Sequence, residues 1–418
     1  MNNIVRKELI DRIAQALDIT PDMFNKAMSV ANGLANYIEN QGYTVEVYKQ
    51  GSFKLGTIVK PYKKDRNSDY DMDLVVQYVD KKEKQNHSAI KQRLGDSLKK
   101  SQYKDYLDKE GRRCWTLIYP KTATIDASFH IDLLPCLNED ASVKETISPI
   151  KYRNSAIAIT NIKDKESNPI VYDWQSSNPK GYIQWFHELN TNKYNSVRAQ
   201  DKKRVFETNR TLFESVEKVG DEYTRTPLQK VIQILKRHRD VMYTNNIYTD
   251  YKPISIIITT LVGKIVEENS IVYNSTYELL HQILLGLEFY ARLLTSGMTS
   301  DFSEDFKNKK LITKHMHTGT PYWSIKNPAD SNENLANRWN DDPQYSIEFF
   351  KWIKQAKNDL IDILDFSKDD ILAKIKYCLG EDVSMMLKSF NFEYGSVSRP
   401  VEDNAVLPKP YGYKNDEV

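Results

Sequence analysis

The sequence has few cysteines, and none of its apolar stretches reaches the length of a membrane span. Its three cysteines, Cys114, Cys136 and Cys378, are far apart, with neither the spacing of a metal site nor that of a disulfide framework. The most apolar run, residues 254–266, is short and predicts a buried helix. The N-terminus lacks the apolar core of a secretion signal. We therefore expect a cytoplasmic protein with no membrane partner.

The chain also lacks a strong excess of charge of either sign. Lys and Arg number 59 against 57 Asp and Glu, so the formal net charge is +2 over 418 residues. Proteins that depend on binding nucleic acid are usually strongly basic. We therefore expect no nucleic-acid template among the partners. A chain of this length is long enough for two or three domains, each with its own core.

What the chain does have is a distinctive strand and turn near its N-terminus. Residues 45–50 (VEVYKQ) alternate β-branched and aromatic side chains with polar ones, which predicts a strand. Gly51 and Ser52 follow directly. A backbone turn there can bring amide N–H groups and the Ser52 hydroxyl close to a phosphate. The pattern indicates a phosphate-binding turn.

A pair of acids follows in a second predicted strand, residues 70–77 (YDMDLVVQ). Because residues i and i+2 of a strand share a face, Asp71 and Asp73 point the same way. Two adjacent carboxylates repel each other, and a divalent cation between them relieves that repulsion. Asp69 with Asp71 is an alternative pair. We prefer Asp71 and Asp73 because the apolar residues 74–76 continue directly into a buried strand.

Three segments carry a resemblance to a known family: GSFKLGT at 51–57, YDMDLVV at 70–76 and FHIDLLP at 129–135. Together they resemble the cGAS/DncV-like nucleotidyltransferases (CD-NTases), bacterial synthases of cyclic oligonucleotide signals within the polymerase-β-like superfamily. The third carboxylate of the superfamily stands in a strand like the last segment, which implies Asp132. The stretch between Ser52 and Asp71 is longer than in the simplest members, and its basic insert at 61–68 predicts a loop. The resemblance covers roughly residues 20–395.

The resemblance implies an α+β fold with two lobes. One is a polymerase-β-like nucleotidyltransferase lobe, a mixed sheet with flanking helices, and the other is a mainly helical lobe similar to that of oligoadenylate synthases. The expected organisation is N-terminal helices over 1–41, with a long helix bridging the lobes, a catalytic lobe over 42–200, a helical lobe over 201–395 and an extended or disordered tail over 396–418. Few large apolar residues occur in the stretch 190–203, which predicts a lobe boundary or a mobile loop.

Two residues of the second half complete the predicted site. Lys236 lies mostly off the apolar stripe of a helix predicted to begin at Thr226-Pro227, and Ser255 lies in the first turn of the next helix. In oligoadenylate-synthase-like enzymes a lysine and a serine at matching positions hold the donor triphosphate. From the residues alone, a solvated lysine and a helix-capping serine are alternative explanations.

The implied site therefore has two parts. The catalytic and metal-binding residues are Asp71, Asp73 and Asp132, and the nucleotide-binding residues are Gly51, Ser52, Lys236 and Ser255. Two Mg²⁺ ions are the expected cofactor, with Mn²⁺ as an alternative.

The resemblance implies an enzyme that condenses nucleoside triphosphates into a cyclic di- or trinucleotide, releasing pyrophosphate, in CBASS anti-phage signalling. ATP is the expected substrate, with or without a second nucleoside triphosphate. We expect a monomer, and a regulatory protein partner is left open. One alternative is a linear oligoadenylate synthase, or a nucleotidyltransferase that modifies RNA or protein. Another is a non-catalytic nucleotide-binding module.

Overall fold

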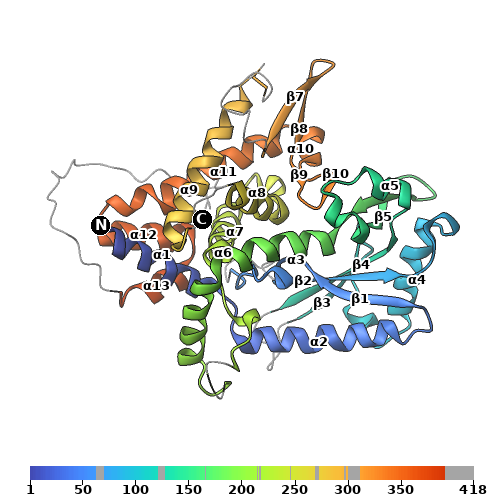
Figure 1. Cartoon of the computed structure of the whole chain (residues 1–418), viewed down its shortest axis with the longest axis horizontal. Helices are drawn as coiled ribbons and strands as arrows, with labels where there is room; N and C mark the ends of the chain where they lie inside the picture. Colours follow the sequence, from blue (N-terminus) through green and yellow to red (C-terminus); the bar gives the residue numbers. More distant parts are fainter. Residues whose placement is uncertain are drawn as a thin grey trace, which may run out of the picture.

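The computed structural model of the chain has one lobe built on a six-stranded sheet and a second, mainly helical lobe (Figure 1). The expected α+β fold class is confirmed. The structure describes residues 1–62, 70–120, 128–164, 166–213, 215, 218–244, 246–268, 273–295, 298–299 and 311–390. Most of the basic insert, Asp69 and the tail over 396–418 lie outside these residues. Within them, no helix combines the length and the apolar character needed to cross a membrane.

The sheet is mixed and has the strand order β1-β2-β4-β5-β6, with β3 paired to β4. Its strands are β1 (Val45–Gln50), β2 (Tyr70–Tyr78), β3 (Trp115–Tyr119), β4 (Phe129–Asn138), β5 (Ile157–Asp164) and β6 (Val171–Ser177). Strands β2 and β4 are parallel, and the other pairs are antiparallel. The register aligns Gln50, Asp73, Asp132 and Thr116 in one row across β1, β2, β4 and β3. Residues far apart in the sequence therefore meet at one level of the sheet.

The two N-terminal helices belong to different cores. Helix α2 (Pro21–Glu39) begins after Thr20, whose side chain accepts a hydrogen bond from the Met23 backbone N–H. Its apolar stripe packs with α4 (His87–Lys99) and the sheet in the first lobe. Helix α1 (Asn3–Leu17) instead packs among the helices of the second lobe. The chain therefore connects the two lobes before the first strand begins.

Helix α7 is at the centre of the second lobe, in contact with several of its helices. The main helices of that lobe are α7 (Pro227–Tyr243), α8 (Ser255–Glu268), α9 (Thr276–Phe289), α11 (Gln344–Leu360), α12 (Lys368–Cys378) and α13 (Glu381–Leu387). Every residue of α7 from 227 to 239 is buried, Lys236 included. The alternative of a solvated Lys236 is therefore wrong, because the helix is enclosed on all sides and its apolar stripe does not mark its only buried face.

The polar stretch 190–203 is helical, not a loop. It lies within α6 (Pro179–Thr208), a continuous helix of 30 residues. Tyr194 is fully buried. Asp201 Oδ1 lies 2.9 Å from Arg204 Nε, and Asp201 Oδ2 accepts a hydrogen bond from the Arg225 backbone N–H. The prediction of a loop was wrong because a low apolar content does not prevent a helix when its polar side chains have tertiary partners.

The second lobe also contains four short strands, which sequence analysis did not predict. Strands β7 (Thr313–His317) and β8 (Thr320–Ser324) form one pair, and β9 (Lys326–Asn327) and β10 (Asp330–Asn334) form another. Strand β10 contacts β6 of the first lobe, where the Ser176 hydroxyl donates to Asp330 Oδ2 at 2.8 Å. The two lobes are therefore joined along this edge as well as through α1 and α2.

Candidate active site

A cavity of about 880 Å³ lies between the sheet and the helical lobe. Its walls include residues of α3 (Gly51–Leu55), β2, β4 and β6 from the first lobe and of α7, α8 and β10 from the second. All of the predicted site residues line it: Gly51, Ser52, Asp71, Asp73, Asp132, Lys236 and Ser255. The structure thus brings together residues from positions 51 to 255, although their roles stay predictions.

The three acids come from neighbouring parallel strands, Asp71 and Asp73 from β2 and Asp132 from β4. Asp71 is well exposed, with 63% of its side-chain area accessible. Burial, together with the neighbouring carboxylates of Asp132 and Asp71, raises the pKa of Asp73 to about 7. The Thr116 hydroxyl donates to Asp132 Oδ1 at 2.6 Å, which fixes the orientation of that carboxylate. The site therefore brings three carboxylates together, and the ionised form is least favourable at Asp73.

This donor set fits a divalent cation of the Mg²⁺ or Mn²⁺ type. Such ions prefer oxygen ligands, and the converging groups here are carboxylates. The raised pKa of Asp73 comes first from burial and then from the repulsion of Asp132 and Asp71, and a cation would relieve that repulsion. His130 Nδ1 lies 3.8 Å from Asp71 Oδ1, so this histidine is beside the acids.

Gly51 is required at its position by both its conformation and its neighbour. Its φ is +65°, in the left-handed region that favours glycine. A Cβ added there would lie 1.8 Å from Asp73 Oδ2. The predicted turn is in fact the start of the short helix α3, which follows β1 directly. The backbone at Gly51 can therefore approach the carboxylates closely, and Ser52 follows on the cavity wall.

Lys236 reaches this region from the helical lobe. Its Nζ donates to the carbonyl oxygen and to the hydroxyl of Thr57, each at 3.2 Å. Burial and the nearby Arg239 lower the pKa of Lys236 to about 7, although Asp240 and Asp73 act in the opposite direction. An anionic ligand in the cavity would favour the charged form.

Ser255 is the first residue of α8, and its hydroxyl has a cationic neighbour. Arg239 Nη1 donates to Ser255 Oγ at 2.9 Å and to the Pro253 carbonyl at 3.0 Å. Sequence analysis did not single out Arg239, because its side chain reaches Ser255 only through the packing of α7 on α8. The start of α8 and the Ser255 hydroxyl make this part of the cavity wall suited to an anion, whereas the Arg239 guanidinium is also paired with Asp240 at 2.8 Å.

The cavity residues that sequence analysis missed include Arg113, Tyr322 and Glu333. Arg113 immediately precedes the residues that lead into β3, and the other two belong to the short strands β8 and β10. The only signal in the sequence was an isolated glutamate within the asparagine-rich segment 327–337. Sequence analysis assigned no chemistry to that segment.

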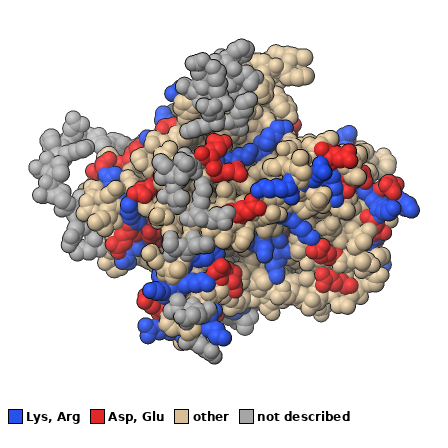
Figure 2. Space-filling model, in the orientation of Figure 1, with Lys and Arg blue, Asp and Glu red and all other residues tan. Residues whose placement is uncertain are grey.

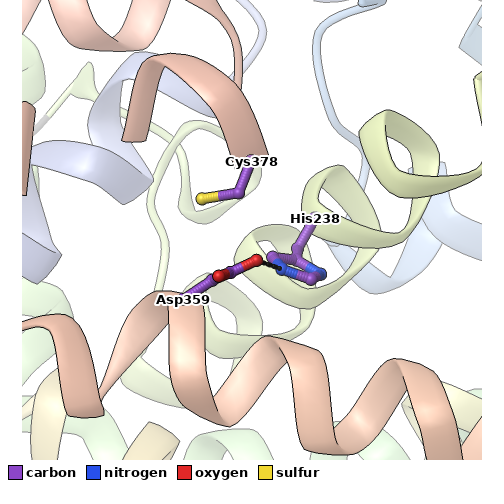
Figure 3. Close-up of side chains that lie close together, drawn as sticks. All are labelled: His238, Asp359 and Cys378. Carbon is purple, nitrogen blue, oxygen red and sulfur yellow. Dashed lines mark hydrogen bonds and ion pairs between the residues drawn. The ribbon is translucent and has the colours of Figure 1, made fainter. Parts of the chain in front are cut away.

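A separate buried cluster in the helical lobe joins α7, α11 and α12 through His238, Asp359 and Cys378 (Figure 3). The Trp352 indole N–H donates to His238 Nδ1 at 3.1 Å, so the ring proton is on Nε2, which donates to Asp359 Oδ2 at 3.1 Å. Lys374 Nζ is 3.1 Å from the other carboxylate oxygen. Both ring nitrogens of His238 are thus engaged, and the cluster is a packing contact and not a metal site.

Comparison with known proteins gives one family match and several similar proteins. Residues 45–133 match the family described as cyclic GMP-AMP synthase DncV-like, nucleotidyltransferase domain. A c-di-GMP synthase of Roseivirga ehrenbergii is 23% identical over 365 residues, which cover 85% of this chain and 79% of that protein.

Two solved structures are similar along most of their length. The Bradyrhizobium diazoefficiens CD-NTase CdnG, in complex with GTP, has a TM-score of 0.64 and 15% identity, covering 90% of this chain and 96% of its own. CdnC of Escherichia coli MS115-1, with ATP, has a TM-score of 0.54 and 13% identity, covering 90% and 98%. At these identities the likeness shows a shared fold of both lobes.

Proposed function

We propose that this cGAS/DncV-like nucleotidyltransferase condenses nucleoside triphosphates into a cyclic di- or trinucleotide and releases pyrophosphate. The resemblance read from the sequence motifs is confirmed by the family match over residues 45–133. The observation that carries the proposal is the shared cavity. Its acids, its glycine-serine turn and its lysine and serine from the opposite lobe face one space large enough for nucleotides.

The three carboxylates would hold two Mg²⁺ ions, with Mn²⁺ as an alternative. Asp71, Asp73 and Asp132 would hold the ions, which would neutralise charge on the reacting phosphate and on the leaving group. Thr116 holds one oxygen of Asp132, and the carboxylate can accept the proton of the attacking hydroxyl.

The chain positions the donor triphosphate from both lobes. Ser52 and the backbone at Gly51 bind it on the sheet side, and Lys236 and Ser255 bind it on the helical side. A hydroxyl oxygen of the acceptor nucleotide attacks the α-phosphorus in line, and the bond to the bridging oxygen of the β-phosphate breaks. Pyrophosphate leaves, and a phosphodiester forms. Repetition of this step between the ends of the linear product closes the ring.

We further propose the cellular setting and the division of the chain that the sequence predicts. The protein acts as a cytoplasmic monomer in anti-phage signalling, with its catalytic lobe over 42–200 and its helical lobe over 201–395. The names of the similar proteins include both GTP and ATP complexes and a c-di-GMP synthase. They support purine nucleoside triphosphates as the substrate class, so GTP joins ATP as a candidate.

The test is to incubate the purified protein with the four labelled nucleoside triphosphates and Mg²⁺, and to resolve the products after phosphatase treatment. A phosphatase-resistant product is expected, because a ring has no terminal phosphate. Asp71→Asn with Asp73→Asn should abolish it while the protein stays folded, since removing metal ligands removes charge neutralisation. Asp69→Asn is the matched control and should retain activity, because the register puts Asp73 beside Asp132. Phosphatase-sensitive linear products only, or a need for an RNA or protein acceptor, would contradict the proposal.

A further inference from the structure

An arginine and a glutamate line the cavity without satisfying each other. Arg113 Nε is buried and has no hydrogen-bond partner among the described residues. Glu333 Oε2 accepts from Asn327 Nδ2 at 2.7 Å and from Ser177 Oγ at 3.3 Å, whereas Oε1 accepts from none of the residues that the structure describes. No ion pair within 4.0 Å joins Arg113 to Glu333, although both are described and each influences the charge of the other. Their free donor and acceptor groups are available to a ligand.

A buried polar atom without a hydrogen-bond partner lowers the stability of the folded protein, so a binding role would explain why the protein keeps it. Desolvation raises the pKa of Glu333, and burial lowers the pKa of Arg113. A buried polar group without a partner costs about 1–3 kcal/mol in proteins. A ligand that offers oxygen or nitrogen acceptors to the guanidinium removes that cost for Arg113 Nε, and N–H donors on the same ligand can pair with Glu333 Oε1.

The order of strands in the sheet puts this pair on a definite side of the acids. Gly51 and Ser52 follow β1 at one edge, the acids are on β2 and β4, and Glu333 is held over β6 at the other edge by Ser177. Arg113 is on the same side as Glu333, because the Ile162 backbone N–H of β5 donates to the carbonyl of the adjacent Arg112 at 2.9 Å. The acids therefore lie between the phosphate-binding turn and the Arg113–Glu333 pair.

In an in-line transfer the attacking hydroxyl and the leaving pyrophosphate are on opposite sides of the reacting phosphorus. If the triphosphate of the donor is held at Gly51 and Ser52, the acceptor nucleotide approaches from the side of β5 and β6. Its base then extends toward Arg113 and Glu333. The ring of Tyr322, which is 45% exposed and lines the same cavity, is available to stack on that base.

We infer that Arg113 and Glu333 select guanine as the base of the acceptor nucleotide, an inference that rests on the proposed function. Guanine presents O6 and N7 as acceptors, which suits a bidentate arginine. Its N1–H and N2–H donors lie side by side and suit the two oxygens of one carboxylate. Adenine offers an unprotonated N1 where guanine has N1–H, so a carboxylate at that point is repelled. Hypoxanthine keeps O6 and N1–H but lacks the N2 amino group.

The experiment separates acceptor from donor by chemistry. An α,β-methylene triphosphate cannot donate its nucleotidyl group, so the analogues of GTP, ITP and ATP serve as acceptors only. An equimolar mixture of 2′,3′-dideoxy-ATP and 2′,3′-dideoxy-GTP has no hydroxyl to attack with and serves as donor only. The rate of linear dinucleotide formation at subsaturating acceptor then reports kcat/KM for each acceptor base.

The wild-type protein should prefer the guanine acceptor over hypoxanthine, and hypoxanthine over adenine. Glu333→Gln replaces one acceptor oxygen by a donor and should reduce the guanine-to-adenine ratio by about ten- to a hundredfold, the range for one bidentate base contact. Arg113→Lys should reduce it as well, because an ammonium cannot form the bidentate pair. Glu145→Gln, which removes an exposed carboxylate on α5 (Ala141–Thr146), is the matched control and should leave the ratio unchanged.

Glu333→Asp provides a second variant, since it keeps the charge but withdraws the carboxylate, and it should also lower the ratio. Preference for an adenine acceptor in the wild type, or an unchanged ratio in both Glu333 variants, would overturn the inference while the proposed function stands, because dinucleotide still forms. A wild-type protein that makes no product from these analogues or from the natural triphosphates would overturn both.

Discussion

At the scale of single residues, Asp73 is the carboxylate of the site whose ionisation is most strongly disfavoured by its surroundings. Its carboxylate is next to Asp71 and Asp132, and Gly51 leaves room for it. Burial and like charge raise its pKa to about 7 from an ordinary value of 3.8. The metal-free protein therefore contains a group that is uncharged in acid and is forced to ionise, unfavourably, near neutral pH.

The first prediction concerns this ionisation. A raised pKa for an acid means that its contribution to stability is complete below the unfolded pKa, near 3.8, and is lost as the pH rises through about 7. The melting temperature of the metal-free protein should therefore fall between about pH 4 and about pH 7 and level off above that. Asp73→Asn should remove much of that fall and be the more stable protein at the higher pH. Parallel pH curves for the two proteins, measured in chelator, would contradict the raised pKa.

Lys236 gives a second prediction at this scale. On the proposed contact of Lys236 with the triphosphate, Lys236→Ala should mainly raise the KM for the donor nucleotide. The loss of one charge-assisted contact costs about 1.5–3 kcal/mol, which corresponds to about ten- to a hundredfold. Initial-rate kinetics with varied nucleoside triphosphate measure the change. Lys26→Ala on the exposed side of α2 is the control, and wild-type kinetics for Lys236→Ala would remove the residue from the site.

Single residues of the site could be predicted where the pattern involves neighbours in the sequence, and not where it depends on contacts between distant segments. Asp71 and Asp73 follow from the two-residue period of a strand, which a sequence displays directly. The burial of Lys236 does not follow from its helix, because periodicity locates the apolar face but not what encloses the polar one. Arg113 and Glu333 are separated by more than two hundred positions and meet only through the sheet order and the β6–β10 contact. No local pattern marks such a pair.

At the scale of elements, side chains of α7 form hydrogen bonds with the end of α3 and with the segment that follows it. Gln229, Gln233 and Lys236 occupy positions i, i+4 and i+7 of α7, so they share one face of the helix. Gln229 Nε2 donates to the Leu55 carbonyl at 2.8 Å, and Gln233 Nε2 donates to the Ile58 carbonyl at 2.7 Å. The helix of one lobe thereby satisfies the backbone of the other next to the phosphate-binding turn. The alignment of the two halves of the site depends on these contacts.

The third prediction tests the hydrogen bond from Gln233 to the Ile58 carbonyl. Gln233→Leu removes the donor to the buried Ile58 carbonyl, and leaving such a group unpaired should cost about 1–3 kcal/mol of unfolding free energy. Activity should fall as well, because the segment that carries Thr57, the partner of Lys236, loses a neighbouring constraint. Urea unfolding with a parallel assay provides both measurements. Gln184→Leu, at an exposed position of α6, should change stability by less than about 0.5 kcal/mol, and an equal loss in both variants would contradict the argument.

The prediction of elements succeeded where apolar periodicity was strong and failed where tertiary partners decided the structure. Strands β1 and β2 and the start of α7 were found from their apolar patterns and from the Thr226-Pro227 signal. The helical state of residues 190–203 was not found, because Asp201 is stabilised by Arg204 and by the Arg225 backbone, which are invisible to composition. The short strands β7–β10 have polar sequences and were missed for a similar reason.

At the scale of the whole molecule, the protein is two cores with a nucleotide-sized cavity between them. Apolar residues of α2, α4 and the sheet form one core, and those of α1 and the later helices form another. Lys and Arg are interspersed with Asp and Glu on the face shown in Figure 2, in keeping with a net charge of +2. Such a surface does not favour a polyanion, whereas the cavity offers cationic and hydroxyl groups to a small anionic ligand.

The last prediction follows from this arrangement. A nucleotide that bridges Ser52 and Asp73 of one lobe and Lys236 of the other should stabilise the whole chain against thermal unfolding, not one lobe alone. Ligand present at about a hundred times its Kd adds about 2.7 kcal/mol. With α,β-methylene-GTP and Mg²⁺ the melting temperature should rise and the transition should sharpen. Asp73→Asn and Lys236→Ala should each reduce the rise, although they lie in different lobes, and Lys26→Ala should leave it intact. A rise in melting temperature that survives both substitutions would mean that the ligand binds outside this cavity.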